Sequence, residues 1–139
     1  MKSLATAVFM AFAFAGVAVA QDYVPPPPVS LTVVVGKSTA VAAWAAPGDP
    51  CNYATCAEYD LRYSTSTITE CNFAAATRAS VAAPSSPGNA ECFDLTGLAC
   101  GTTYYFAVKT RDSAGNWSVI SNVVSRTPMC NVTVEVTCQ

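Results

Sequence analysis

Short runs of alternating hydrophobic and polar residues fill the middle of the chain. The clearest run covers residues 58–63, where Tyr59, Leu61 and Tyr63 alternate with three charged residues. An alternation of period two predicts a strand with one buried face. Comparable runs cover residues 31–35, 41–44, 92–95, 104–108 and 119–125, and turn-forming residues separate many of them. Together these signals predict an all-β domain, a seven-stranded antiparallel β-sandwich.

The first twenty residues have the pattern of a secretory signal peptide. Lys2 gives a positive start, an apolar run follows it, and Ala18 and Ala20 form a small-residue cleavage signal. Cleavage after Ala20 leaves Gln21 as the first residue of a secreted chain. A membrane anchor is the alternative, but the run is short for a span of roughly 20 apolar residues. We therefore expect a protein that is extracellular or at the cell surface, with no membrane partner after cleavage.

Two further segments flank the predicted sandwich. Residues 21–28 form a leader that ends in four consecutive prolines, which favours a stiff spacer over a ligand for a proline-binding groove. Residues 129–139 form a tail in which Val132, Val134 and Val136 share one face of an alternating pattern. We expect an extra C-terminal strand, either on its own sandwich or on the exposed edge of a neighbouring subunit. A disordered tail is the third interpretation.

The composition removes several classes of function. The chain has 139 residues, no histidine and a formal net charge of −2 at pH 7. Without histidine, no histidine-based triad, acid–base pair or metal site can form. The slight negative charge gives no reason to expect nucleic acid as a partner. The carboxylates are dispersed without the spacing of a glycosidase or calcium site, so we expect no enzyme activity, no metal and no cofactor.

Several segments keep the order and spacing of one known family. They are Trp44-Ala-Ala-Pro47, Tyr59-Asp-Leu-Arg-Tyr-Ser64, Leu95-Thr-Gly-Leu98, Gly101-Thr-Thr-Tyr104-Tyr-Phe-Ala-Val108 and the stretches 112–118 and 121–124. In this order they resemble a fibronectin type III domain of the bacterial type, which we place at residues 29–128. The resemblance implies an immunoglobulin-like sandwich, in which Trp44 packs between the sheets and the Tyr104 hydroxyl bonds the backbone near Leu98. The expected core residues are Trp44, Tyr59, Leu61, Tyr104, Phe106 and Val108.

Seven cysteines in so short a chain indicate an oxidising compartment. Structural disulfides are favoured over a metal site, because only Cys51 and Cys56 are close in sequence and a zinc site usually needs two such pairs. Such domains usually have no cysteines, so here the chain departs from the family pattern. The disulfide candidates are Cys51, Cys56, Cys71, Cys92, Cys100 and Cys130.

The resemblance narrows the cysteine pairing, because it gives each cysteine a place on the sandwich. The pairs that it implies are Cys51–Cys56, Cys100–Cys130 and Cys71–Cys92, with Cys138 left over for an intermolecular bridge. The alternative is a Cys130–Cys138 pair, which leaves Cys100 odd and requires the tail to bend.

Two sequons, Asn116-Trp-Ser118 and Asn131-Val-Thr133, would carry glycans if the source glycosylates secreted proteins. The resemblance and the lack of a catalytic motif imply a secreted, non-enzymatic module for binding, adhesion or structure. Its partners would be protein or carbohydrate at the cell surface. The alternative is a self-assembling subunit of an extracellular filament or surface coat, in which the tail strand and the odd cysteine join copies of the chain.

Overall fold

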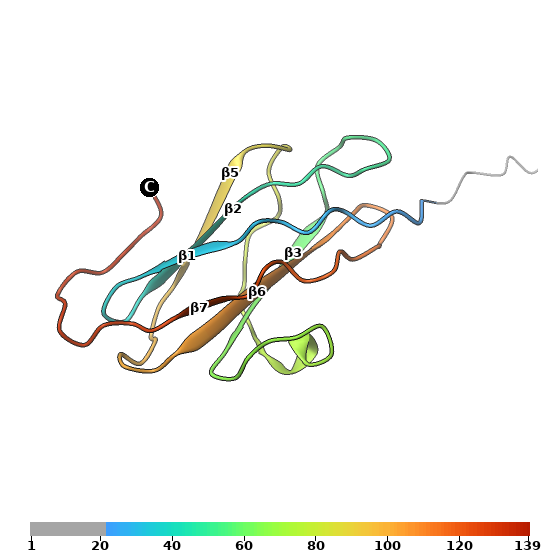
Figure 1. The fold of residues 1–139 in the computed structure, drawn as a ribbon. Helices are drawn as coiled ribbons and strands as arrows, with labels where there is room; N and C mark the ends of the chain where they lie inside the picture. Colours follow the sequence, from blue (N-terminus) through green and yellow to red (C-terminus); the bar gives the residue numbers. More distant parts are fainter. Residues whose placement is uncertain (1–21) are drawn as a thin grey trace, which may run out of the picture.

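The computed structural model describes residues 22–139, which form two antiparallel sheets around a shared core (Figure 1). One sheet has the order β1-β2-β5 and the other the order β4-β3-β6-β7. The strands are β1 (Thr32–Val35), β2 (Ala40–Ala45), β3 (Glu58–Ser64), β4 (Thr77–Arg78), β5 (Ala90–Leu95), β6 (Tyr104–Arg111) and β7 (Val124–Arg126). The seven-stranded antiparallel sandwich is therefore confirmed. The predicted signal peptide, residues 1–20, lies outside the described residues.

The alternating run at residues 58–63 forms most of β3, which pairs with β6 along its whole length. The register sets Leu61 opposite Val108 and Tyr63 opposite Phe106. Leu61, Val108 and Phe106 are completely buried. Period two in the sequence thus becomes one buried face on each of the two central strands.

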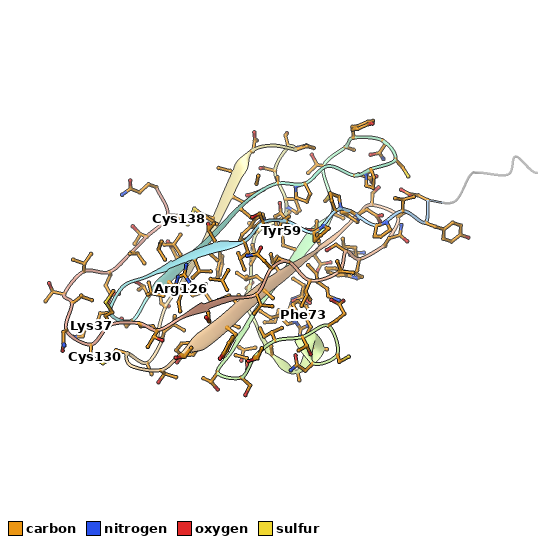
Figure 2. The ribbon with its side chains drawn as sticks, in the orientation of Figure 1. Lys37, Tyr59, Phe73, Arg126, Cys130 and Cys138 are labelled. Carbon is orange, nitrogen blue, oxygen red and sulfur yellow. A yellow bond between two sulfur atoms is a disulfide. The ribbon has the colours of Figure 1, made fainter. Side chains whose placement is uncertain are left out.

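Both sheets contribute to one hydrophobic core. Trp44 of β2 meets Tyr59 of β3 edge to face, with ring centroids 5.0 Å apart, so this pair joins the two sheets (Figure 2 labels Tyr59). The Tyr104 hydroxyl accepts a hydrogen bond from the Ala99 amide at 3.0 Å, next to the position that the family resemblance implies. The expected core residues lie as follows: Trp44, Tyr59, Leu61, Phe106 and Val108 are buried, and Tyr104 packs at the margin.

A smaller cluster covers part of the outer face of the four-stranded sheet. It is built around Phe73 of a short 3-10 helix, η1 (Phe73–Ala75), which lies between β3 and β4 (Figure 2). Phe73 packs with Ile68 and with Ala107 of β6. The cationic groups of Arg62 and Lys109 lie 5.2 and 5.1 Å from the centre of its ring. Cation–π contact therefore adds to apolar packing in holding this segment on the sheet.

The tail does not form the extra C-terminal strand that the sequence predicts. Residues 127–139 contain no strand. The Lys37 amide donates to the Val134 carbonyl at 3.2 Å, but the Val136 amide donates to the Thr39 hydroxyl rather than to a backbone carbonyl. A strand needs a ladder of backbone hydrogen bonds, and these isolated bonds do not make one. The predicted extra strand on the chain's own sandwich, with Val132, Val134 and Val136 along one face, is therefore wrong.

Candidate functional site

Three segments meet at the end of the sandwich where the leader joins the domain (Figure 1). The Cys51 thiol donates to the Asp22 carboxylate at 2.9 Å, and the Asn116 amide group donates to the Asp22 carbonyl at 3.0 Å. The Ser113 hydroxyl donates to the Asp49 carboxylate at 3.1 Å. These bonds join the leader (22–28), the β2–β3 loop (46–57) and the turn after β6 (112–118). We call this surface the loop pole.

Two carboxylates at the loop pole are fully buried. Asp49 accepts a hydrogen bond from the Cys51 amide at 3.1 Å, and Asp112 accepts from the amide and the side chain of Asn116, both at 2.8 Å. Burial opposes the ionisation of Asp112, but hydrogen bonds from Asn116 and neighbouring amides outweigh it and lower the pKa. Among the ion pairs of residues 22–139, none includes Asp49 or Asp112. Hydrogen bonds rather than ion pairs therefore satisfy the two buried carboxylates of the loop pole.

One group at the loop pole has the donor atoms of a metal site. Asp22, Asp49 and Cys51 each place a ligand atom within 4.8 Å of the others. The hydrogen bond to Asp22, with desolvation and the nearby carboxylates, raises the pKa of the Cys51 thiol to about 11. A metal ion would have to displace the proton that this thiol donates to Asp22, because a metal ligand is a thiolate. Cys51 therefore serves as a hydrogen-bond donor that ties the loop to the leader.

The structure corrects the expected Cys51–Cys56 disulfide, because both thiols are free. Gly48 and Thr55 form a β-bridge across the loop, which places Cys56 at the base and Cys51 near the tip. The buried Cys56 thiol donates to the Pro47 carbonyl at 3.4 Å. Burial, with the charges of nearby carboxylates, raises its pKa to about 11. The backbone bridge between Gly48 and Thr55 thus keeps the sulfurs of Cys51 and Cys56 apart.

Each segment of the loop pole carries an exposed aromatic side chain. Among the described residues, three large aromatic side chains are exposed: Tyr23 by 72%, Tyr53 by 86% and Trp117 by 39%. Each lies on a different one of the three joined segments. Tyrosine and tryptophan are the residues most enriched in binding hot spots. Sequence reasoning missed this set, because only the fold brings the three segments together.

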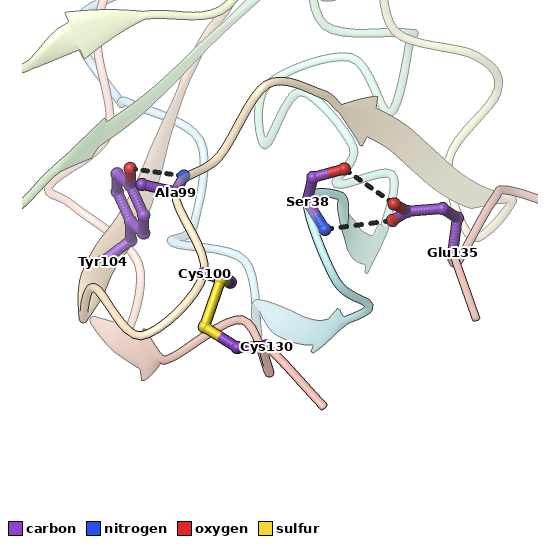
Figure 3. Close-up of a disulfide and its surroundings, with 6 residues drawn as sticks. All are labelled: Ser38, Ala99, Cys100, Tyr104, Cys130 and Glu135. Carbon is purple, nitrogen blue, oxygen red and sulfur yellow. Dashed lines mark hydrogen bonds between the residues drawn. A yellow bond between two sulfur atoms is a disulfide. The ribbon is translucent and has the colours of Figure 1, made fainter. Parts of the chain in front are cut away.

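The tail lies at the opposite end of the sandwich, along the β1–β2 turn (Figures 1 and 3). We call residues 129–139 the C-terminal strap. The Glu135 carboxylate accepts hydrogen bonds from the amide and hydroxyl of Ser38 and from the Thr39 hydroxyl. At Gly36, a Cβ atom would lie 2.7 Å from the Val134 carbonyl oxygen, so a glycine is needed for this close approach. The strap is thus docked on its own domain.

Two disulfides fix the C-terminal strap. Cys100 is bonded to Cys130, which is the pairing expected from the resemblance (Figure 3). Cys92 is bonded to Cys138, so the expected Cys71–Cys92 bridge and the spare Cys138 are both wrong. The reason is that Cys92 lies on β5 opposite Ala43, at the outer face that the strap reaches, whereas Cys71 lies before η1 beside the other sheet. Cys71 is free and exposed.

The comparisons with known proteins concern the fold. The sequence matches no protein-family model and no curated protein. The solution structure of a fibronectin type III domain derived from the human KIAA0970 protein is 13% identical, with a TM-score of 0.52 over 81% of this chain and 82% of that one. A structure titled a myokine structure is 19% identical, with a TM-score of 0.51 over 76% of this chain and 99% of that one.

The chain has a fibronectin type III-like fold. At these identities the likeness concerns the fold, and function must come from the surface of this chain. In the part of the fibronectin type III-like chain that the structure describes, no helix is long and apolar enough to cross a membrane.

The two sequons differ in their surroundings on this fibronectin type III-like sandwich. The Asn116 amide group donates to the Asp22 carbonyl and to the Asp112 carboxylate, so a glycan there would break the joint between leader and turn. Asn131 is exposed on the strap. Glycosylation therefore stays a prediction, with Asn131 as the sterically available acceptor.

Proposed function

We propose that the mature chain is a secreted, non-enzymatic binding module that presents the loop pole to a partner. One observation supports it above the others: three segments that side-chain hydrogen bonds join at one end of the sandwich each carry an exposed aromatic side chain. Aromatic residues on rigidly held loops are typical of binding surfaces. The buried carboxylates at this pole are occupied by structural hydrogen bonds, which argues against an acid–base role for them.

The disulfides support an extracellular location. Four of the seven cysteines form two disulfides, and such bonds persist in oxidising compartments. Together with the predicted signal peptide, they favour adhesion or binding outside the cell over an intracellular role.

The binding role is tested with labelled mature protein on intact cells and extracellular material of the source organism. We expect saturable binding that unlabelled protein displaces. The variant Tyr53→Asn/Trp117→Ala should compete poorly, whereas Val34→Ala, which removes an exposed apolar side chain from β1, should compete like the wild type. Binding that never saturates, or that both variants share equally, would contradict the proposed function.

A self-assembling subunit is the second candidate, and the exposed thiols Cys51 and Cys71 favour it. Cys138 is bonded to Cys92 within the chain, so it offers no intermolecular bridge. Two exposed thiols on different segments would instead link copies into open chains. Gels of the purified protein with and without reductant test this. A ladder that collapses on reduction, and that stops at dimers in Cys71→Ser, would support assembly. A monomer band in both lanes would contradict it.

A further inference from the structure

We propose that the loop pole binds a cationic segment of a partner protein, one that carries lysine or arginine side chains. The inference names the partner class for the proposed binding function, and it rests on that function. It starts from the exposed aromatic side chains of Tyr23, Tyr53 and Trp117, one on each of the three segments that form the loop pole. The charges near these side chains then indicate which class of partner would bind.

The charge at the loop pole is negative. Asp22, Asp49 and Asp112 all lie close enough to Cys51 to act on its thiol electrostatically. The ion pairs of residues 22–139 lie on the outer face of the four-stranded sheet, and of their cations Arg111 borders the loop pole at Trp117. The pairs are Glu58 with Arg78 and Arg111, Asp60 with Arg62 and Arg78, and Glu70 with Lys109. Charge complementarity therefore favours a positively charged partner at the loop pole.

The aromatic rings suit the same partner. A lysine or arginine group over the face of tryptophan or tyrosine is attracted by the ring quadrupole. The Trp117 ring already lies 5.7 Å from the Arg111 guanidinium, so this chain itself places a cation on one of these rings. Arg111 shares the Glu58 carboxylate with Arg78. Tyr53 is the most exposed aromatic residue of the described part, and its ring is available to a partner. Exposed rings on segments that also carry Asp22, Asp49 and Asp112 thus favour a cation over a neutral or anionic group.

The test measures fluorescence anisotropy of a labelled peptide of alternating glycine and lysine with the mature protein. Length-matched peptides with glutamine or glutamate in place of lysine are the controls for charge. Tyr53→Asn is used because asparagine tolerates the left-handed backbone at this position, where φ is 55°. Val34→Ala and Glu70→Gln remove an exposed apolar side chain and a carboxylate from other faces, and circular dichroism confirms that each variant is folded.

We expect the lysine peptide to bind and the glutamate peptide not to bind. Tyr53→Asn and Trp117→Ala should each weaken binding about three- to tenfold, and Asp22→Asn about threefold with a smaller dependence on salt. Val34→Ala and Glu70→Gln should bind like the wild type. Equal losses in Glu70→Gln, or no loss in the two aromatic variants, would overturn the inference.

Three further outcomes separate this inference from the proposed function. If the glutamine peptide or a neutral oligosaccharide such as cellohexaose binds as tightly, with the same dependence on Tyr53 and Trp117, the loop pole is a binding surface but the cationic partner is wrong. If the labelled protein binds cells saturably while the lysine peptide fails, the function stands and this inference alone is overturned. If saturable binding to cells is also missing, the proposed function itself fails.

Discussion

The Glu135 carboxylate accepts two hydrogen bonds from Ser38, which lies almost a hundred residues earlier in the chain (Figure 3). The Ser38 amide donates at 3.1 Å and its hydroxyl at 2.7 Å, and the Thr39 hydroxyl adds a third bond at 2.7 Å. Hydrogen bonds to a carboxylate favour its charged form, and here they lower the pKa of Glu135 to about 2. An ionised side chain thus anchors the middle of the C-terminal strap, between its two disulfides.

The anchor should weaken in acid. Because the folded pKa of Glu135 lies below its ordinary value of 4.5, the contribution is fully present above pH 4.5 and is lost as the pH falls through about 2. A carboxyl-carbon NMR titration of Glu135 should show this low midpoint, and the Ser38 amide signal should follow it. Glu135→Gln cannot titrate, so its Ser38 amide should not shift over this range. A midpoint near 4.5 would contradict the anchor.

The Cys92–Cys138 disulfide should stabilise the folded state because it lowers the conformational entropy of the unfolded chain. The bond joins residues 46 positions apart. Cys92→Ser/Cys138→Ser should lower the free energy of unfolding by about 2–4 kcal/mol, measured by urea denaturation. Cys71→Ser changes a free, exposed cysteine and serves as the control, with a change within about 0.5 kcal/mol. If Cys92→Ser/Cys138→Ser were as stable as the wild type, this disulfide would add nothing to the stability of the fold.

The sandwich was predictable from the sequence because its signals are local. The alternation of Tyr59, Leu61 and Tyr63 follows directly from a strand with one buried face, and Trp44 and Tyr104 lie where the family resemblance implies. Turn-forming residues separate several of the runs and limit the register. These features depend on neighbours in the chain, and the structure keeps them.

The tail and the loop pole were not predictable in the same way. Three valines at alternate positions predict a strand, but three hydrogen bonds to Glu135 and the bond from Cys92 to Cys138 decide where the strap lies. Such long-range contacts leave no local pattern. The expected pairing of Cys92 with Cys71 failed for the same reason, because the path of the strap brings Cys138 to β5, whereas the Cys100–Cys130 pair was predicted correctly. The three exposed aromatic side chains of the loop pole likewise come to one end of the sandwich only when three distant segments meet.

Replacing Trp44 should strongly destabilise the core. It is 5% exposed and packs edge to face on Tyr59 of the other sheet. Trp44→Ala should lower the free energy of unfolding by about 3–5 kcal/mol through lost burial and the cavity left behind. Thermal melting and urea denaturation measure the loss, with Val34→Ala on the exposed side of β1 as the control. An unchanged midpoint would contradict the assignment of Trp44 to the core.

Tyr53 should be dispensable for folding. Its φ of 55° lies in the left-handed region, which is costly for a bulky side chain, and its ring is 86% exposed. Tyr53→Asn should leave the stability unchanged or raise it by about 1 kcal/mol, because asparagine adopts this backbone more readily. Tyr53→Val should be destabilised, since a β-branched residue suits this region least. Urea denaturation of the three proteins gives the order. A large loss in Tyr53→Asn would show that the ring has a structural role.

The Cys51 thiol should react slowly despite its exposure. Its pKa is raised to about 11, and the hydrogen bond to Asp22 is the largest cause. Because the thiolate is the nucleophile, the rate of alkylation by iodoacetamide should rise about tenfold per pH unit up to that pKa. Asp22→Asn removes the charge and should speed the reaction of Cys51 at pH 8. Cys56 is the internal control, because its raised pKa comes from burial, Asp49 and Asp112 rather than Asp22. Peptide mass spectrometry follows both cysteines in one sample. Equal acceleration of Cys51 and Cys56 would mean that the variant loosens the loop pole as a whole, and no acceleration would mean that Asp22 does not control the thiol.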